Sequence, residues 1–345
     1  MSTTPELITV GRISVDLYGE QLGRSLTEVT TFRKSIGGTA TNVAVAASRL
    51  GRHAAVATRV GDDKFGRYIR HALEHTFGVD VRWVGTDPDL ATPLAFAELD
   101  PPEEPSIIFY RSPRAPDQNL TVDDIDLDEV ARTEIFWIPA SRFAWEPSSG
   151  AVRAMLEHRG RRRHTVLDLD WRPMFWESAE HATERISPIL DQVTIAIGNR
   201  EECQIAVGTR DPDEAADRLL ERGLEMAVVK LGGDGVMVAT SDGVRERIPP
   251  FPVEVVCGLG SGDAFGGAFC HGLLSGWDHR RPPPGTGGCV RFGNAAGAIV
   301  AARLMCADDM PTVAEVKAFL AERSSDSARH SHSVPTHSSD QENHQ

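Results

Sequence analysis

This 345-residue sequence lacks the segments that mark membrane or secreted proteins. No uncharged apolar stretch approaches the roughly 18 residues of a membrane span, so no transmembrane helix is predicted. The first residues contain neither the basic nor the apolar part of a signal peptide. The five cysteines are widely spaced and include no Cys-x-x-Cys pair, which argues against a disulfide scaffold or a zinc site. We therefore expect a cytoplasmic protein with reduced thiols.

Positive charge is also in deficit. Lys and Arg number 36 and Asp and Glu number 50, so the formal net charge is −14. Binding to nucleic acid or to an anionic membrane requires a basic surface, so we expect neither kind of partner. A small anionic ligand remains compatible with this balance, because a single pocket can be locally basic. No Gly-x-x-x-x-Gly-Lys-Ser/Thr phosphate-binding motif occurs.

Short apolar runs alternate with helical segments along the chain. A chain of this length can bury a large core, as one α/β domain with an appendage or as two smaller domains. The alternation favours a doubly wound, mostly parallel sheet with helices on both faces. The predicted strands are 7–11, 54–60, 134–139, 165–168, 193–198 and 226–231, and the predicted helices are 39–50, 65–75, 147–160, 178–190, 211–223, 263–276 and 289–304.

Three segments interrupt this alternation. Residues 92–99 and 106–111 predict a β-hairpin, which is too small for a domain and has the size of a lid or of an edge used in dimerisation. A proline- and glycine-rich loop at 282–288 separates two late helices. Residues 323–345 are rich in Ser and His with almost no apolar residues, so we expect a disordered tail. The expected organisation is one domain over 1–322 followed by this tail.

The stretch from Gly258 to Asp263, Gly-Leu-Gly-Ser-Gly-Asp, crowds glycines into a turn that leads into a helix. Free backbone N–H groups and the helix dipole make such a start suitable for binding phosphate. An aspartate there fits a base that takes a proton from an attacking hydroxyl. It fits a helix N-cap equally well, and this stretch alone does not separate the two interpretations.

A second glycine-rich stretch lies near the N-terminus. Gly37 and Gly38 precede an alanine-rich helix that carries Asn42 in its first turn. The Asn42 side chain and the bare glycine backbone can donate hydrogen bonds to a polyol. A capped helix packed closely in a core explains the same residues.

Together, the two stretches resemble the paired signatures of the ribokinase-like (PfkB) sugar kinases. Their order and their spacing of roughly 220 residues match that family, and the resemblance covers about 7–320. It implies an ATP-dependent carbohydrate kinase in which Asp263 is the base and the hairpin at 92–111 is a lid over the sugar. The other implied sugar contacts are Asp16, Gly37, Gly38 and Asn42, and the implied anion hole for the phosphoryl group is Gly260, Ser261 and Gly262.

The resemblance also implies a nucleotide and magnesium site. Asn199 and Glu202 match an Asn-x-x-Glu motif that organises magnesium and phosphate, with Glu202 acting through water. Without the family, these two residues would be an ordinary helix N-terminus, and Asn294 would be a surface residue. The implied walls of the adenine site are Lys230, Gly232, Gly235 and Asn294.

Three local segments resemble one branch of the family, the 5-dehydro-2-deoxygluconokinases of inositol breakdown. They are 16–21, 108–111 and 197–202. A sugar-acid substrate carries a carboxylate, which arginine binds bidentately. Arg111 ends the lid strand and Arg172 follows a predicted strand end, so both are candidates, although most arginines in a protein lie on its surface. We therefore expect phosphorylation of the primary hydroxyl of a keto-deoxy sugar acid, with 5-dehydro-2-deoxygluconate as the first choice.

Other functions remain open at this point. A 2-keto-3-deoxygluconokinase, a fructokinase and a ribokinase share the same motifs, and a catalytically silent sugar-binding regulator is an alternative of another class. Cys257-Gly258-Leu259 replaces an aspartate-containing segment that helps to hold potassium in many members, so activation by K⁺ is left open. The segment 112–119 also differs from the branch pattern. By analogy with the family, a homodimer through the lid is expected.

Overall fold

The computed structural model describes residues 3–102, 105–162, 164–277 and 288–331. Its centre is a nine-stranded sheet in which all neighbouring strands are parallel, except that β12 is antiparallel to both of its neighbours. The strand order is β13 (Arg245–Ile248), β12 (Val236–Thr240), β11 (Met226–Lys230), β10 (Ile195–Asn199), β9 (His164–Asp168), β8 (Ile135–Pro139), β1 (Leu7–Val10), β4 (Ala54–Gly61) and β5 (Val84–Asp87).

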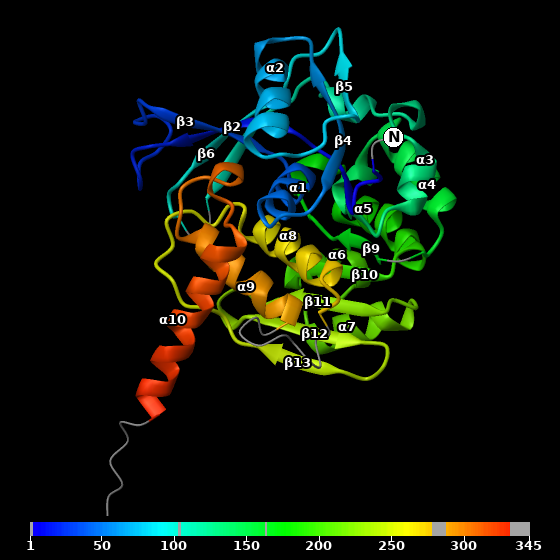
Figure 1. Cartoon of the computed structure of the whole chain (residues 1–345). Coiled ribbons are helices and arrows are strands. Elements are labelled where there is room, and N and C mark those ends of the chain that lie inside the picture. Colours follow the sequence, from blue (N-terminus) through cyan, green and yellow to red (C-terminus); the bar gives the residue numbers. More distant parts are fainter. Residues whose placement is uncertain (1–2, 103–104, 163, 278–287, 332–345) are drawn as a thin grey trace, which may run out of the picture.

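Helices cover both faces of this sheet, which confirms the predicted doubly wound architecture (Figure 1). Because side chains alternate along a strand, neighbours such as Ile195 and Ala196 belong to the cores on opposite faces. One core includes residues of α1 (Thr39–Arg49), α2 (Lys64–His71), α8 (Ser261–Leu274), α9 (Gly288–Ala301) and α10 (Val313–Ser331). The other includes residues of α3 (Leu127–Arg132), α4 (Ser148–Arg159), α5 (Ala179–Ile186), α6 (Arg200–Val207) and α7 (Pro212–Glu221).

A second, four-stranded sheet projects from one side of the molecule (Figure 1). Its order is β3 (Phe32–Gly37), β2 (Ser14–Gly19), β6 (Leu94–Glu98) and β7 (Ser106–Tyr110). The antiparallel β6–β7 pair confirms the predicted hairpin. The sequence did not predict β2 and β3, which extend this hairpin into a sheet. β2 pairs in parallel with β6, so a segment close to β1 is joined directly to the hairpin.

The C-terminal boundary differs from the sequence-based expectation. Helix α10 continues to Ser331, so 323–331 are helical, while 332–345 lie outside the described residues. Most of the loop expected at 282–288 also falls outside them, and α9 begins at Gly288. None of the helices described is both long and apolar enough to cross a bilayer.

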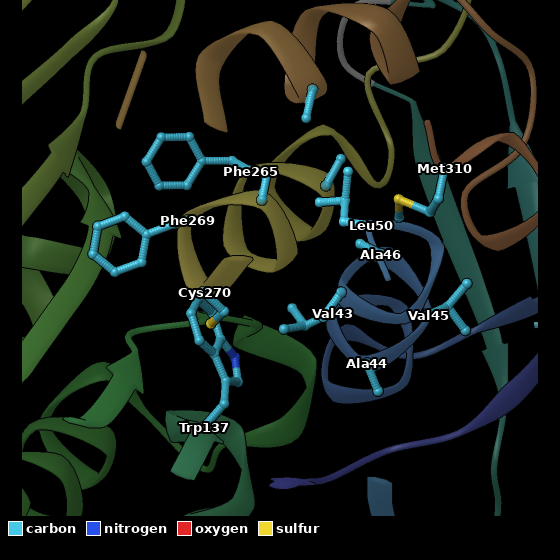
Figure 2. Packing of buried hydrophobic residues seen from close by; sticks show 14 of the residues in the cluster. Val43, Ala44, Val45, Ala46, Leu50, Trp137, Phe265, Phe269, Cys270 and Met310 are labelled. Atoms are coloured by element: carbon cyan, nitrogen blue, oxygen red, sulfur yellow. The ribbon is translucent and has the colours of Figure 1, made fainter. Parts of the chain in front are cut away.

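Two helices that carry predicted site residues, α1 and α8, pack with their backbones in close approach (Figure 2). A Cβ on Gly267 of α8 would lie 2.3 Å from the Cβ of Ala46 and 2.8 Å from the backbone nitrogen of Ala47. A Cβ on Gly266 would lie 2.8 Å from the ring of Trp137 on β8. Only glycine fits at these two positions, and alanines supply most of the facing surface of α1.

We expect Gly267→Ala to destabilise the fold. The added methyl group has to push α1 away, which costs about 1–3 kcal/mol and outweighs the better helix propensity of alanine. Urea unfolding followed by circular dichroism measures the loss. Gly233→Ala is the control, since no heavy atom lies within 4 Å of the Cβ it would introduce. Equal stability of the two variants would contradict the close packing.

Candidate functional site

The Gly258–Asp263 stretch forms a loop that turns into α8. Gly260 is the N-cap and has a φ of 80°, which glycine adopts without strain. The backbone N–H groups of Ser261, Gly262 and Asp263 belong to the first turn and have no partner in the helix, whereas the N–H of Ala264 already bonds to the Gly260 carbonyl at 2.8 Å. The start of α8 therefore presents free donors and the positive end of a helix dipole.

Asp263, at the third position of α8, meets Asn42 of α1. The Asn42 Nδ2 donates to Asp263 Oδ2 at 2.8 Å, so the close packing of the two helices brings both signature stretches together. Burial raises the pKa of Asp263 to about 6, although the hydrogen bond from Asn42 opposes this change. The Oδ1 atom of Asn42 is buried and has no partner among the described residues. It is a free acceptor beside a carboxylate.

Asp16 of β2 is a second carboxylate in the region of Asn42 and Asp263. Its carboxylate accepts from Ser14 Oγ at 2.6 Å and from the Tyr18 hydroxyl at 3.5 Å, and burial raises its pKa to about 6. A Cβ on Gly37 would lie 1.8 Å from Asp16 Oδ2, so only glycine can stand there. Gly38 has a φ of 106° and backs onto the Arg12 carbonyl.

Most of these groups line one small cavity. The site residues named from the sequence that border it are Asp16, Gly38, Asn42, Arg172, Gly260 and Asp263, whereas Gly37 does not border it. Ile107 and Phe109 of β7 also line it, so the predicted hairpin contributes to the wall of this cavity. Its remaining lining residues are Arg12, Ser14, Tyr18, Thr39, Leu259 and Cys306.

A larger cavity of about 520 Å³ lies on the other side of the loop. Gly258, Ser261 and Gly262 border it, whereas Gly260 and Asp263 border the smaller cavity. All four residues expected to form an adenine site line the larger cavity: Lys230, Gly232, Gly235 and Asn294. The other walls are mostly apolar, among them Pro250, Phe251, Val253, Val255 and Phe265. The loop thus stands between two pockets, one polar and one suited to a flat apolar group.

The Asn-x-x-Glu motif opens α6 as a capping box. The Glu202 N–H donates to Asn199 Oδ1 at 2.9 Å, and the Asn199 N–H donates to Glu202 Oε2 at 2.6 Å. The interpretation as a helix N-terminus is therefore correct, and it does not exclude a second role. Lys230 Nζ lies 3.7 Å from Glu202 Oε2, and a Cβ on Gly262 would lie 3.4 Å from that ammonium. The positive charge of Lys230 is therefore adjacent to the Gly258–Asp263 loop.

Charges are concentrated around Lys230. Burial alone would lower its pKa, but Glu202, Asp168 and Asp263 together raise it. Burial raises the pKa of Asp168, and Lys230 opposes that rise. No group of three or more His, Cys, Asp or Glu side chains able to hold a metal occurs in the part of the chain that the structure describes. A preformed cation cage of side chains is therefore absent from that part.

The two candidate arginines differ in placement. Arg172 lines the smaller cavity with 38% of its side chain exposed, and Asp170, at 3.4 Å, raises its pKa. Arg111 is buried and does not border that cavity. Its Nη2 bonds to both oxygens of Asp117, at 2.8 and 3.0 Å.

Sequence reasoning missed one charged wall residue, Arg12. It is 4% exposed and borders the smaller cavity. The available signal was its position directly after β1, at the carboxyl end of a parallel strand, where doubly wound sheets bind ligands. The sequence analysis also did not single out Phe109 of β7, which lines the same cavity.

Comparison with known proteins decides the family. The pfkB family of carbohydrate kinases matches residues 4–313. This chain is a PfkB family carbohydrate kinase. Two relatives named 5-dehydro-2-deoxygluconokinase support this: that of Clostridium perfringens is 32% identical over 321 residues, covering 91% of this chain and 92% of the relative. The relative from Geobacillus kaustophilus is 33% identical over 331 residues, which cover 94% of this chain and 96% of the relative. The sequence-based family assignment is thereby confirmed.

Solved structures of PfkB proteins share the fold. A PfkB protein from Polaromonas is 25% identical, with a TM-score of 0.75, and covers 88% of this chain and 98% of its own. A fructokinase from Vibrio cholerae, solved with fructose, ADP and calcium ion, is 24% identical, with a TM-score of 0.78. The match covers 92% of this chain and 100% of the fructokinase. The chain is therefore a sugar kinase, a phosphotransferase of the ribokinase-like fold.

We expect Asp263→Asn to change how stability depends on pH. The pKa of Asp263 is near 6 in the folded protein and about 3.9 in an unfolded chain. Ionisation of Asp263 therefore lowers the free energy of unfolding. This loss is complete above about pH 6 and absent below about pH 4. From pH 5 to pH 8 the variant should gain about 1 kcal/mol over the wild type in urea unfolding. Asp62→Asn, at a side chain 71% exposed, should show no such gain. An advantage independent of pH would contradict the raised pKa.

Proposed function

We propose that this kinase uses ATP to phosphorylate the primary hydroxyl of a keto-deoxy sugar acid. The observation that carries the proposal is the position of Asp263, in the wall of the smaller cavity, beside the loop that also borders the larger one, and bonded to Asn42. A pKa near 6 leaves the carboxylate largely charged at neutral pH and still basic enough to accept a proton. Asp263 would take the proton of the sugar hydroxyl while the hydroxyl oxygen attacks the γ-phosphorus of ATP.

The loop would hold the transferring group. Gly260 borders the smaller cavity and Ser261 and Gly262 border the larger one, so their backbone N–H groups would stabilise the negative charge that builds up on phosphoryl oxygens. Lys230 adds a positive charge beside the same loop. The larger cavity, with Gly232, Gly235 and Asn294 in its walls, has the size and apolar character that an adenosine needs.

Magnesium fits this arrangement through water. Mg²⁺ keeps several waters and is commonly bound by one or two carboxylates together with substrate phosphates, so no complete protein cage is required. Glu202 is the carboxylate expected to meet its water shell, with Asn199 fixing the orientation of Glu202. When bound, Mg²⁺ would neutralise part of the negative charge of the phosphates.

The polyol end of the substrate would lie between β2 and α1. Asp16 can accept from sugar hydroxyls, and the unpartnered Oδ1 of Asn42 offers a second acceptor. Gly37 and Gly38 keep the backbone bare there, so a hydroxyl can approach closely. Ile107 and Phe109 of the hairpin would exclude water from the reacting groups.

Two observations support a sugar acid as the substrate. Arg172 lines the same cavity as Asp16 and Asp263, with 38% of its side chain exposed. The relatives from Clostridium perfringens and Geobacillus kaustophilus are named for 5-dehydro-2-deoxygluconate, which carries a carboxylate. We propose this compound as the substrate. 2-Keto-3-deoxygluconate, fructose and ribose are the competitors that a substrate screen has to include.

We expect Asp263→Asn to lower kcat by about 10²–10⁴-fold, because the general base is lost. ATP binding, measured by calorimetry, should stay near that of the wild type, and Asp62→Asn should keep full activity. A coupled assay of ADP release measures turnover. Turnover near the wild-type value would overturn the assignment, and absence of turnover in the wild type on every sugar would instead favour a silent sugar-binding regulator.

We expect Arg172→Ala to raise KM for 5-dehydro-2-deoxygluconate by about 10-fold or more, because a charged hydrogen bond to the carboxylate is lost. KM for fructose should change much less, since fructose has no carboxylate. Arg24→Ala, at an exposed arginine outside the cavity, is the control. An equal rise for both substrates would show that Arg172 does not recognise the acid group.

A further inference from the structure

The smaller cavity contains a second arginine with unused hydrogen-bonding capacity. Arg12 is 4% exposed and lies on the cavity wall. Its Nη2 donates two hydrogen bonds, to Thr39 Oγ1 at 3.1 Å and to Asp170 Oδ2 at 2.9 Å. Its Nε is buried and has no partner among the described residues. A buried donor without a partner is costly, and a ligand that supplies an acceptor removes that cost.

Arg12 is held rigidly in place. Its guanidinium carbon lies 4.6 Å from the centroid of the Phe175 ring and 6.0 Å from that of Phe109, within the range of a cation–π contact. Asp170 fixes one edge of the guanidinium, and Ser141 Oγ donates to the same Asp170 oxygen at 2.6 Å. The arginine therefore loses little freedom when a ligand binds.

Asp170 brings Arg12 and Arg172 to one place. Its Oδ2 pairs with Arg12, and its Oδ1 lies 3.4 Å from Arg172 Nη2. Asp170 has a φ of 24°, an uncommon conformation for a residue with a side chain, and such positions concentrate at functional sites. Thr39 also donates to Oδ1, at 3.4 Å. One buried carboxylate thus joins the two arginines that border the cavity.

Arg12 and Arg172 share one carboxylate. Asp170 forms an ion pair with each of them, at 2.9 Å and 3.4 Å. Burial lowers the pKa of Arg12, and Asp170 opposes this. Asp16 also lies in the cavity, but its hydrogen bonds go to Ser14 and Tyr18. An anionic group of the ligand would give the two guanidinium groups a second partner.

We propose that Arg12 binds the carboxylate of the sugar acid together with Arg172, and that this pair determines the preference for an acid over a neutral sugar. The inference rests on the proposed function and deepens it, because it names a second recognition residue. Two guanidinium groups that converge on one carboxylate discriminate against a neutral sugar, since without the anion the two arginines share Asp170 and the buried Nε of Arg12 stays without a partner.

The test is the substrate preference of Arg12→Gln. We expect KM for 5-dehydro-2-deoxygluconate to rise by about 10- to 100-fold, with KM for fructose changed by less than about 3-fold and kcat for fructose retained. Binding of 5-dehydro-2-deoxygluconate without ATP, measured by calorimetry, should weaken by the same factor. Arg12→Lys keeps the charge against Asp170 and should lose less affinity, and it carries the test if Arg12→Gln does not fold.

Arg59→Gln is the matched control, since it breaks the Arg59–Asp124 ion pair of 2.6 Å outside both cavities. It should leave both KM values unchanged. Equal losses for the acid and for fructose in Arg12→Gln, or no loss, would overturn the role of Arg12 and leave the proposed function intact. If the wild type phosphorylates neutral sugars and no acid, the proposed substrate is wrong and the role of Arg12 is overturned with it.

Discussion

The close approach of α1 and α8 is the constraint on which the site depends. Asn42 and Asp263 are 221 positions apart in sequence, and their side chains meet at 2.8 Å only because glycines on α8 and alanines on α1 let the backbones approach. A larger side chain at Gly267 would separate the helices and with them Asp263 and Asn42. The small residues of both stretches are therefore as much a part of the site as the polar residues they accompany (Figure 2).

The second organising feature is the shared edge of the sheet. Arg12, Asp170 and Lys230 all lie at or just beyond the carboxyl ends of parallel strands, where the fold directs free backbone groups and loops. An acidic protein of net charge −14 can in this way gather buried arginines and a lysine in one region while its surface remains negative. Local charge, rather than overall charge, decides which ligands such a site accepts.

The layer architecture and most central elements could be predicted from the sequence, because apolar runs and helical periodicity are local properties. β3 could not, since the first half of this strand, Phe32-Arg33-Lys34, is exposed and includes two charged residues, and the strand pairs with β2 along its whole length. The same limit applies to the site. Asp263 and Asn42 were found through their glycine-rich surroundings, whereas the local sequence marks Arg12 only by its position after a strand, and its partner Asp170 is 158 positions away.

The parallel pairing of β2 with β6 has a mechanical consequence. β2 carries Asp16, and β6 continues through the hairpin into β7, which carries Phe109. The wall that carries Asp16 and the strand that carries Phe109 are therefore parts of one hydrogen-bonded body. A displacement of the small sheet moves both together, so access to the cavity and the shape of its wall change in a single step. Under the proposed function, a displacement that opens the cavity would also withdraw Asp16 from the ligand, which couples release of the product to its loss of binding.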